Sequence, residues 1–403
     1  MEGVTIALSF AGAFALGTIF SVLGAVKLHL APALGVDDAQ YGRLISALMF
    51  TSMIAVLVIG PLQDAIGFAP IAVVAFIASG VCLWLLAAVK NYKVALFASA
   101  LLGVGAMCAS VTGSSLGPTV LFDGENPAVA QNVINVFFGI GAFLTPFLVG
   151  KLMNNLGYQK TVSIIGAIVF VPIILVFFSA FPETPAGFDI AGTLGVLATP
   201  YIIFGGLALF CYVGLEITMA GFVSTYLKDH DLTVEQANKW LAGFWVALIV
   251  GRILASVLLL ATELPPEQQA PIAPILGLFA VGSILIMVTA KTAKAGITGT
   301  LLTGLIFGPI FPMLVGVTQF KSASIEAGIA GSVFSWIFAL GLLGGTLVPM
   351  LIGKLSAAST IRQSMKTAAI VAVALVILSG ILWAVPAADP AEIMEQVAMI
   401  AAQ

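Results

Sequence analysis

Stretches of about 20 apolar residues, separated by short polar or Pro/Gly-rich breaks, recur along the whole chain. A helix of about 20 residues is what crosses the roughly 30 Å hydrocarbon core of a bilayer. Backbone polar groups find no water there, so each stretch must satisfy them internally as a helix. The pattern predicts twelve transmembrane helices. They are expected at residues 4–30, 40–61, 69–89, 93–121, 127–153, 160–180, 197–227, 235–261, 271–290, 295–319, 325–354 and 363–385.

The longest break between apolar stretches falls near the middle of the chain, at 181–195. It separates six predicted spans from six. We therefore expect an all-α membrane protein of two six-helix bundles. The predicted divisions are an N-terminal bundle, a central inter-bundle loop, a C-terminal bundle and a C-terminal tail, at 1–181, 182–196, 197–386 and 387–403.

Two internal matches support this division. Leu144–Leu152 reads LTPFLVGKL and Leu347–Leu355 reads LVPMLIGKL, at an offset of 203 residues. Val36–Gln40 resembles Val234–Asn238 at an offset of 198. Parallel halves related by a pseudo-twofold axis, with a site near the midplane, are a common construction of secondary transporters.

Composition excludes several classes of function. With 61% hydrophobic and 8% charged residues, the chain has too little polar surface for a water-soluble fold. A net charge of −3, with basic residues scattered in pairs, offers no patch for nucleic acid. Cys82, Cys108 and Cys211 all lie in apolar segments, and no Walker loop, HExxH or Cys/His cluster is present. We expect neither an enzyme nor a cofactor or metal site.

The basic residues are distributed unevenly among the connections. Of the fifteen Lys and Arg residues, all but Arg252 and Lys321 lie in or beside odd-numbered connections. Lys and Arg near span ends resist translocation, so these connections are predicted to be cytoplasmic. The thirteen residues are Lys27, Arg43, Lys90, Lys93, Lys151, Lys160, Lys228, Lys239, Lys291, Lys294, Lys354, Arg362 and Lys366.

Several motifs resemble the major facilitator superfamily, and within it the branch of bacterial fucose permeases and sugar:proton symporters. They are 131–142, 308–312, the Gly-rich segment from Gly331 to Gly345, and the weaker Gly251-Arg252. Gly60–Gly67 resembles the superfamily's loop signature of Gly, Asp and Gly. The resemblance covers essentially the whole chain. It implies a sugar carrier working by alternating access, monomeric, in a bacterial inner membrane.

The chain departs from the family pattern in two respects. Ala65, Ala69 and Pro70 stand where the loop signature usually carries Arg or Lys, and that loop normally faces the cytoplasm. Either the chain inserts in the family orientation against its charges, or it is an inverted-topology variant, natural or engineered. The carboxylates that related symporters carry in the first and fourth spans also have no counterpart, which leaves proton symport through Glu216 and uniport as alternatives.

Polar residues inside predicted spans are the candidates for transport. Glu216 is the only carboxylate well inside a span, and intramembrane carboxylates tend to face a cavity or a partner. It is predicted to bind substrate hydroxyls and to carry a coupling proton. Asn132 and Asn135 share one helix face and suit sugar hydroxyls, and the resemblance places Asn132 in a central cavity. The alternative is that these groups only join neighbouring helices, a role expected for Gln131.

Four further residues are candidates for lining the cavity. Trp245 and Trp336 lie in mid-span, where their rings can stack on a sugar or simply pack between helices. Ser115 and Gln319 can add polar groups.

Two charged residues are predicted to act as gates. Arg252 is expected to contact Asp64, in the loop between the second and third spans. A direct pair of Arg252 with Glu216 is not expected, because their estimated depths differ by about ten residues, or roughly 15 Å.

The sequence thus predicts a carrier of a small polar solute, most simply a hexose-type sugar, with protons and the lipid bilayer as its other partners. Two alternatives remain. A drug or amphiphile exporter of the same superfamily would use a broad aromatic cavity, whereas the Asn132–Asn135 stripe favours a hydroxylated substrate. A non-transporting membrane scaffold would bind no solute.

Overall fold

The computed structural model describes residues 2–182, 197–322 and 329–387, and these residues are mostly helical, with no strand among them. Most of the predicted central loop and tail therefore lie outside the described residues. By contact clustering the chain forms two compact units. Unit 1 comprises described residues of 1–124, 134–188 and 328–335, and unit 2 those of 125–133, 189–327 and 336–403.

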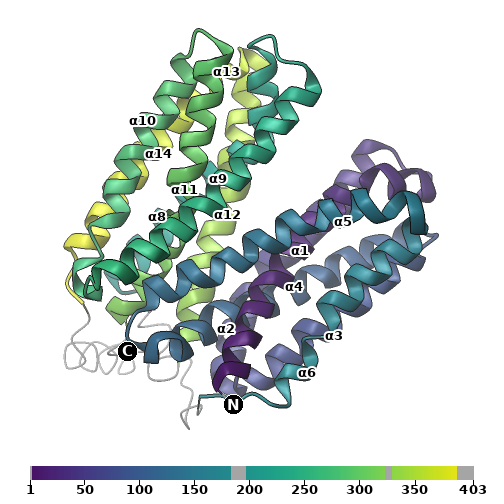
Figure 1. Ribbon diagram of the computed structural model, residues 1–403, viewed down its shortest axis with the longest axis horizontal. Helices are drawn as coiled ribbons and strands as arrows, with labels where there is room; N and C mark the ends of the chain where they lie inside the picture. The colour runs from purple at the N-terminus through teal and green to yellow at the C-terminus, as the bar shows by residue number, and fades with distance from the viewer. Residues whose placement is uncertain (1, 183–196, 323–328, 388–403) are drawn as a thin grey trace, which may run out of the picture. The chain divides into compact units, whose positions relative to one another are not determined.

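Unit 1 contains the first helices of the chain (Figure 1). They are α1 (Glu2–Leu34), α2 (Asp38–Ile66), α3 (Phe68–Ala88), α4 (Tyr92–Val120), η1 (Leu121–Gly124), most of α5 (Pro127–Phe170) and the short α6 (Ile173–Val176). Helix α4 packs against α1, α2 and α3 and is the most enclosed helix of this unit.

Unit 2 contains the later helices together with the start of α5. They are α8 (Pro200–Lys228), α9 (Val234–Thr262), η2 (Pro266–Gln268), α10 (Ile272–Thr289), α11 (Ala293–Ser322), most of α12 (Ala330–Ala358), α13 (Ile361–Ser364) and α14 (Lys366–Ala384). Helix α11 packs against α8, α9 and α10, a position in this unit like that of α4 in unit 1.

Eleven helical runs are long and apolar enough to cross a membrane among the described residues. One of them, Pro127–Val176, has 50 residues, about 75 Å of helix at 1.5 Å per residue. Gly157 interrupts it with a positive φ of 73°, which glycine adopts without steric cost. The predicted fifth and sixth spans are this single run, divided at Gly157.

After Gly157 the chain turns back along α3. The Tyr158 hydroxyl donates to the Leu86 carbonyl at 2.8 Å, near the end of α3. Further along, Phe170 packs on Trp84, and Phe181 stacks on Phe68 at the start of α3. Residues 158–181 therefore cross unit 1 from one end to the other.

Two helix starts of the same kind lie at the shorter sequence match. Asp37 and Gln40 form a capping box before α2, and Thr233 and Gln236 form one before α9. In a capping box each side chain bonds the other residue's backbone N–H, so the first turn is satisfied. These caps correspond at an offset of 196 residues, whereas the sequence match has an offset of 198. The shared signal is thus a helix start of the same kind.

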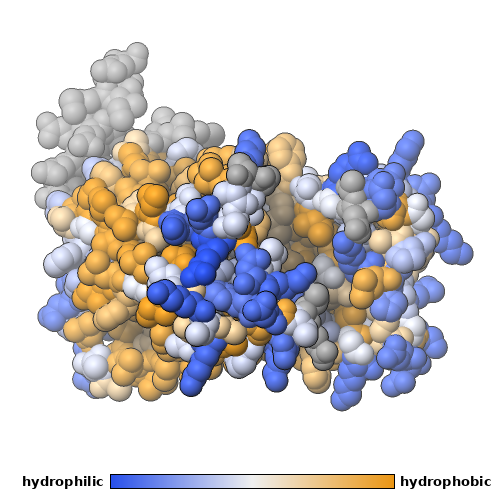
Figure 2. All heavy atoms as spheres, turned by 90° about the horizontal axis from the view of Figure 1, so that it is seen from above, coloured by the Kyte–Doolittle hydropathy of each residue, from blue (hydrophilic) through white to orange (hydrophobic). Residues whose placement is uncertain are grey.

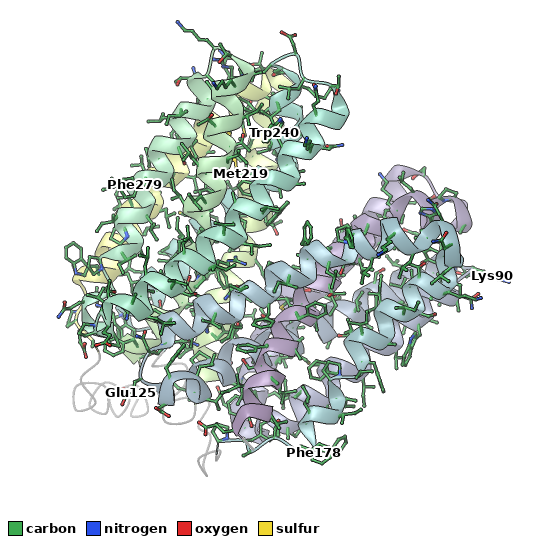
Figure 3. All side chains as sticks on the ribbon, in the orientation of Figure 1. Lys90, Glu125, Phe178, Met219, Trp240 and Phe279 are labelled. Carbon is green, nitrogen blue, oxygen red and sulfur yellow. The ribbon has the colours of Figure 1, made fainter. Side chains whose placement is uncertain are left out.

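The odd-numbered connections meet at one end of each unit. In unit 1, Tyr92 donates to the Gln40 carbonyl at 3.2 Å, and Tyr158 bonds the end of α3. In unit 2, Arg362 donates to the Val288 carbonyl at 3.0 Å, joining the residues around α13 to the end of α10. Figure 3 shows Lys90 and Phe178 at opposite ends of unit 1. We call the end of each unit that carries these connections its basic end.

The outer surface is largely apolar, as a bilayer requires. Large side chains such as Phe279, Phe97 and Ile370 are 60%, 63% and 69% exposed. Apolar residues cover much of the face in Figure 2, and Phe279 points away from its helical neighbours in Figure 3. The chain is thus a multi-pass integral membrane protein.

Candidate functional site

A buried ion pair lies in the middle of unit 2. The Arg252 Nη2 atom is 3.7 Å from the Glu216 Oε1 atom, and the two side chains are 2% and 12% exposed. This distance is short enough for an ionic contact but is longer than a hydrogen bond. Glu216 Oε1 has no hydrogen-bond partner in the described part of the chain. One carboxylate oxygen is therefore held by charge alone.

This pair corrects the sequence-based prediction that the two residues are too far apart in depth. Glu216 lies 12 residues before the end of α8, and Arg252 lies 18 residues after the start of α9. The helices run antiparallel from one connection, so the difference is six residues, or about 9 Å. The long arginine side chain spans that distance. The expected contact of Arg252 with Asp64 would join the two units, and it stays a prediction.

Helix α11 approaches α9 closely enough to hold Arg252 in place. A Cβ atom at Gly251 would lie 2.0 Å from the Leu305 carbonyl oxygen, and one at Gly308 would lie 2.3 Å from that of Leu248. Both positions therefore require glycine. The resulting backbone contact brings Arg252 Nε within 3.0 Å of the Gly308 carbonyl oxygen.

The Gly308 carbonyl is available because of a proline one turn later. Pro312 has no N–H, so it cannot bond the carbonyl four residues earlier in the helix. Arg252 supplies the missing donor. The segment 308–312, noted in the sequence, thus provides the backbone carbonyl that accepts the hydrogen bond from Arg252.

Tyr212 completes the cluster. It precedes Glu216 by one helical turn, is fully buried, and donates to the Phe307 carbonyl at 2.9 Å. It also interacts with both Glu216 and Arg252. Sequence reasoning did not select Tyr212, although its i, i+4 spacing from a buried carboxylate was the available signal.

A second polar group joins the start of α5 to α11, also within unit 2. Gln131 Nε2 donates to Gln319 Oε1 at 3.0 Å, and both side chains are buried. A Cβ atom at Gly316 would lie 2.2 Å from the Ala128 Cα atom, so the two helices touch through their backbones. Gln131 was expected only to pack; in the structure it is the direct partner of the predicted Gln319.

Asn132 is fully buried beside this pair. Its Nδ2 atom donates to the Ala128 carbonyl at 2.9 Å and lies 3.5 Å from the Met313 sulfur. Its Oδ1 atom has no partner among the described residues. An unbonded buried acceptor costs about 1–3 kcal/mol. Asn135, one turn further along α5, is also buried.

The remaining predicted cavity residues are placed differently from one another. Ser115 is buried in unit 1, and its hydroxyl has no partner among the residues described. Trp245 is half-buried and meets Phe244 edge-to-face with ring centroids 5.4 Å apart. Trp336 is 36% exposed.

Asp64 forms a separate cluster in unit 1, at the opposite end from the basic connections. Its Oδ1 atom accepts from the Gly331 N–H at 2.9 Å. Its Oδ2 atom accepts from the Ser332 N–H at 2.7 Å and from the Ser332 hydroxyl at 2.5 Å. The first N–H groups of a helix have no partner within it, and a carboxylate there also meets the positive end of the helix dipole. Asp64 thus caps the start of α12.

Comparison with known proteins identifies the fold. The family model described as Major Facilitator Superfamily matches residues 8–346. Among solved structures, the transporter FucP in the outward conformation superposes with a TM-score of 0.79 at 18% identity, covering 94% of this chain and 98% of that one. The fucose:proton symporter FucP of E. coli, in a second structure, gives 0.75 at 20% identity, covering 94% and 99%. At such identity the likeness shows the fold.

Curated relatives match over part of their length. The "Putative glucose/galactose transporter" of Helicobacter pylori is 27% identical over 165 residues, 41% of this chain and 38% of that protein. The "Glucose/galactose transporter" of Brucella abortus biovar 1 is 27% identical over 159 residues, 39% and 36%. The matched region thus spans less than half the length of these relatives.

Proposed function

The chain belongs to the major facilitator superfamily, and from this premise we propose that it carries a hexose-type sugar across the membrane by alternating access. The family and its sugar-transporting relatives point to a transporter and not to an enzyme. We further propose twelve spans in two pseudo-symmetric six-helix bundles, with the run divided at Gly157 counting as two. The proposed setting is a monomer in a bacterial inner membrane.

The observation that carries the sugar proposal is the buried Asn132 amide. Its Oδ1 atom has no partner among the described residues, and the Gln131–Gln319 pair lies beside it on the same helices. An amide presents both donors and acceptors, as sugar hydroxyls do, without adding charge to an apolar helix. The proposed substrate-binding residues are Asn132, Asn135, Glu216, Trp245, Trp336, Gln319 and Ser115, with Gln131 holding Gln319 in place.

We propose that Glu216 couples transport to protons. Its Oε1 atom is held by the charge of Arg252 without a hydrogen bond, so a proton can be added there with no hydrogen bond broken at that oxygen. Arg252 stays charged at working pH and keeps its bond to the Gly308 carbonyl in either state. Protonation of Glu216 therefore releases the ion pair while the arginine remains anchored.

Asp64 and Arg252 are proposed gating residues. The gating role of Asp64 is supported by the three hydrogen bonds that it accepts at the start of α12. These bonds must break before Gly331 and Ser332 can move away from α2. Arg252, on α9, contacts Glu216 on α8 and the Gly308 carbonyl on α11, and these two contacts support its gating role.

Uptake by proteoliposomes tests both the substrate and the coupling. Labelled glucose, galactose and fucose are supplied with and without an inward proton gradient. We expect accumulation of one hexose with the gradient, and Glu216→Gln should retain exchange while losing gradient-driven accumulation. If Glu216→Gln keeps both uptake and its pH dependence, the coupling proposal fails.

A matched pair of amide variants tests the sugar site. Asn132→Ala should weaken sugar binding up to about tenfold, since a neutral hydrogen bond contributes about 0.5–1.5 kcal/mol. Asn154→Ala removes an exposed amide from the same helix and should leave binding unchanged. Equal effects of the two variants would remove Asn132 from the site. Absent sugar uptake together with export of amphiphiles would favour the exporter alternative.

The orientation that we propose follows the charges, with the basic ends in the cytoplasm. Single cysteines at Ala65 and at Asn91 are labelled in intact cells with a reagent that does not cross membranes. We expect the cysteine at position 65 to react and the one at 91 to be protected. The reverse pattern would show that the chain inserts in the family orientation against its charge bias.

A further inference from the structure

An open cleft lies at the basic end of unit 2, where the residues around α13 meet the end of α10. Its volume is about 420 Å³. Arg362 is fixed in its wall by bonds from Nε to the Val288 carbonyl and from Nη2 to the Ala290 carbonyl. A guanidinium has five N–H groups, so three remain for a ligand. The lining residues are Val288, Thr289, Thr360, Arg362, Gln363 and Lys366.

An exposed apolar stripe leads from this cleft along α14. Ile370, Val373 and Ile377 follow Lys366 at steps of four, seven and eleven residues, so they share its helix face. They are 69%, 45% and 57% exposed. On a membrane-spanning helix such a stripe faces acyl chains. A cationic cleft above an apolar stripe matches the two parts of an anionic phospholipid.

Unit 1 contains a second cleft of the same construction, beside the turn at Gly157. Its volume is about 570 Å³, and its cation is Lys160. Ile164, Ile168 and Val171 follow on the same helix face and are 37%, 37% and 55% exposed. The lining residues are Leu156, Gln159, Lys160, Ser163, Ile164 and Ala167.

The internal repeat relates the two clefts. The match between the fifth and eleventh predicted spans has an offset of 203 residues. At the same offset, Gln159 corresponds to Arg362 and Ser163 corresponds to Lys366. Both clefts therefore occupy corresponding places in the two halves of the chain, each where a new helix departs from the basic end.

We propose that each cleft binds the headgroup phosphate of an anionic phospholipid, whose acyl chains lie along the adjoining apolar stripe. Among the described residues, each cleft is lined by at least one cation and by no acidic residue. A free phosphate would use the cations alone, whereas a lipid uses the stripe as well. The unit 2 cleft, with Arg362 and Lys366, is expected to bind more tightly than the unit 1 cleft with Lys160.

Native mass spectrometry of the detergent-purified full chain tests the proposal. Phosphatidylglycerol, phosphatidylcholine and inorganic phosphate are titrated separately. We expect two phosphatidylglycerol molecules to bind in preference to phosphatidylcholine, with no comparable binding of phosphate. Lys366→Gln and Lys160→Gln should each weaken lipid binding at one of the two sites about fivefold. One basic residue near an anionic lipid strengthens binding by about that factor.

Matched controls remove the same charge elsewhere. Lys93 and Lys228 are exposed at the basic ends of units 1 and 2 and line neither cleft. Lys93→Gln and Lys228→Gln should leave both sites intact. Equal binding of phosphatidylcholine, equal loss in the control variants, or full competition by inorganic phosphate would each overturn the proposal. An unchanged unfolding temperature for each variant shows that a loss of binding is not a loss of fold.

Discussion

Two carboxylates inside helical spans, one in each unit, are stabilised by different means. Asp64 in unit 1 accepts three hydrogen bonds from the start of α12 and faces a helix N-terminus. Glu216 in unit 2 faces a full positive charge at 3.7 Å, with one oxygen lacking a hydrogen bond. Three hydrogen bonds fix the geometry of Asp64, whereas at Glu216 the Oε1 atom faces Arg252 without a hydrogen bond among the described residues. This difference supports the proposed gating role of Asp64 and the proposed proton-coupling role of Glu216.

The largest effect is expected from removing the arginine. Arg252→Leu leaves Glu216 without its cation and the Gly308 carbonyl without its donor. Breaking a buried pair on one side costs about 3–5 kcal/mol, whereas replacing both partners with apolar residues is often neutral. In detergent, Arg252→Leu should lower the unfolding temperature sharply and Glu216→Leu/Arg252→Leu should restore most of it. A double variant as unstable as the single one would show that the pair is not the cause.

Adding a methyl group at the helix crossings should be the next most damaging change. Gly308→Ala would place Cβ 2.3 Å from the Leu248 carbonyl oxygen, beside Arg252, and Gly60→Ala would place it 2.3 Å from that of Gly331, beside Asp64. Overpacking costs about 1–3 kcal/mol. Gly282, with nothing within 4 Å, is the control, and Gly282→Ala should be neutral or stabilising. Unfolding temperatures that do not separate the crossing variants from the control would refute these close approaches.

Weakening the Asp64 cap should have a moderate effect. Asp64→Asn keeps one acceptor oxygen and loses the charge, so we expect a loss of about 1–2 kcal/mol, typical of a helix cap. Hydrogen exchange should increase at Gly331 and Ser332 and remain unchanged in α9. If Asp64→Asn instead alters exchange around Arg252, the two clusters are not independent.

The smallest effect concerns pH. His230, beyond the end of α8, contacts the Tyr226 hydroxyl at 3.0 Å. Burial and the nearby Arg362 lower its pKa below the ordinary 6.5, while Asp229 and Asp231 oppose this. A lowered pKa favours the neutral ring in the folded state, so its contribution to stability is full above pH 6.5 and is lost as pH falls through the folded pKa. His230→Gln should flatten the unfolding temperature between pH 7.5 and 5.

The span positions could be predicted because each depends only on local apolar length. Predicted 69–89 and 271–290 were found as α3 and α10 with ends shifted by one residue. The division of 127–180 was also predicted, although the helix runs on to Gly157, beyond the predicted end at 153. Its position depends on one residue with a positive φ, which composition does not reveal.

The site could be predicted only in part. Glu216 and Asn132 are conspicuous because polar groups are rare in spans, and Gln319 was selected for the same reason. Their partners depend on tertiary packing. Arg252 meets Glu216 because glycines let α9 and α11 touch, and Asp64 meets a helix that starts more than 260 residues later. Such contacts leave no periodic signal in the sequence.

The turn at Gly157 has a consequence for the sidedness of everything that follows it. A chain that crosses a membrane alternates sides, so the side of any later residue is set by whether the number of earlier crossings is odd or even. If 127–176 ran as one straight helix, every connection after it would exchange faces, and the two copies of the repeated Pro/Gly-Lys-Leu segment would point in opposite directions. A single glycine conformation therefore fixes the number of crossings on which the proposed parallel relation of the two halves depends.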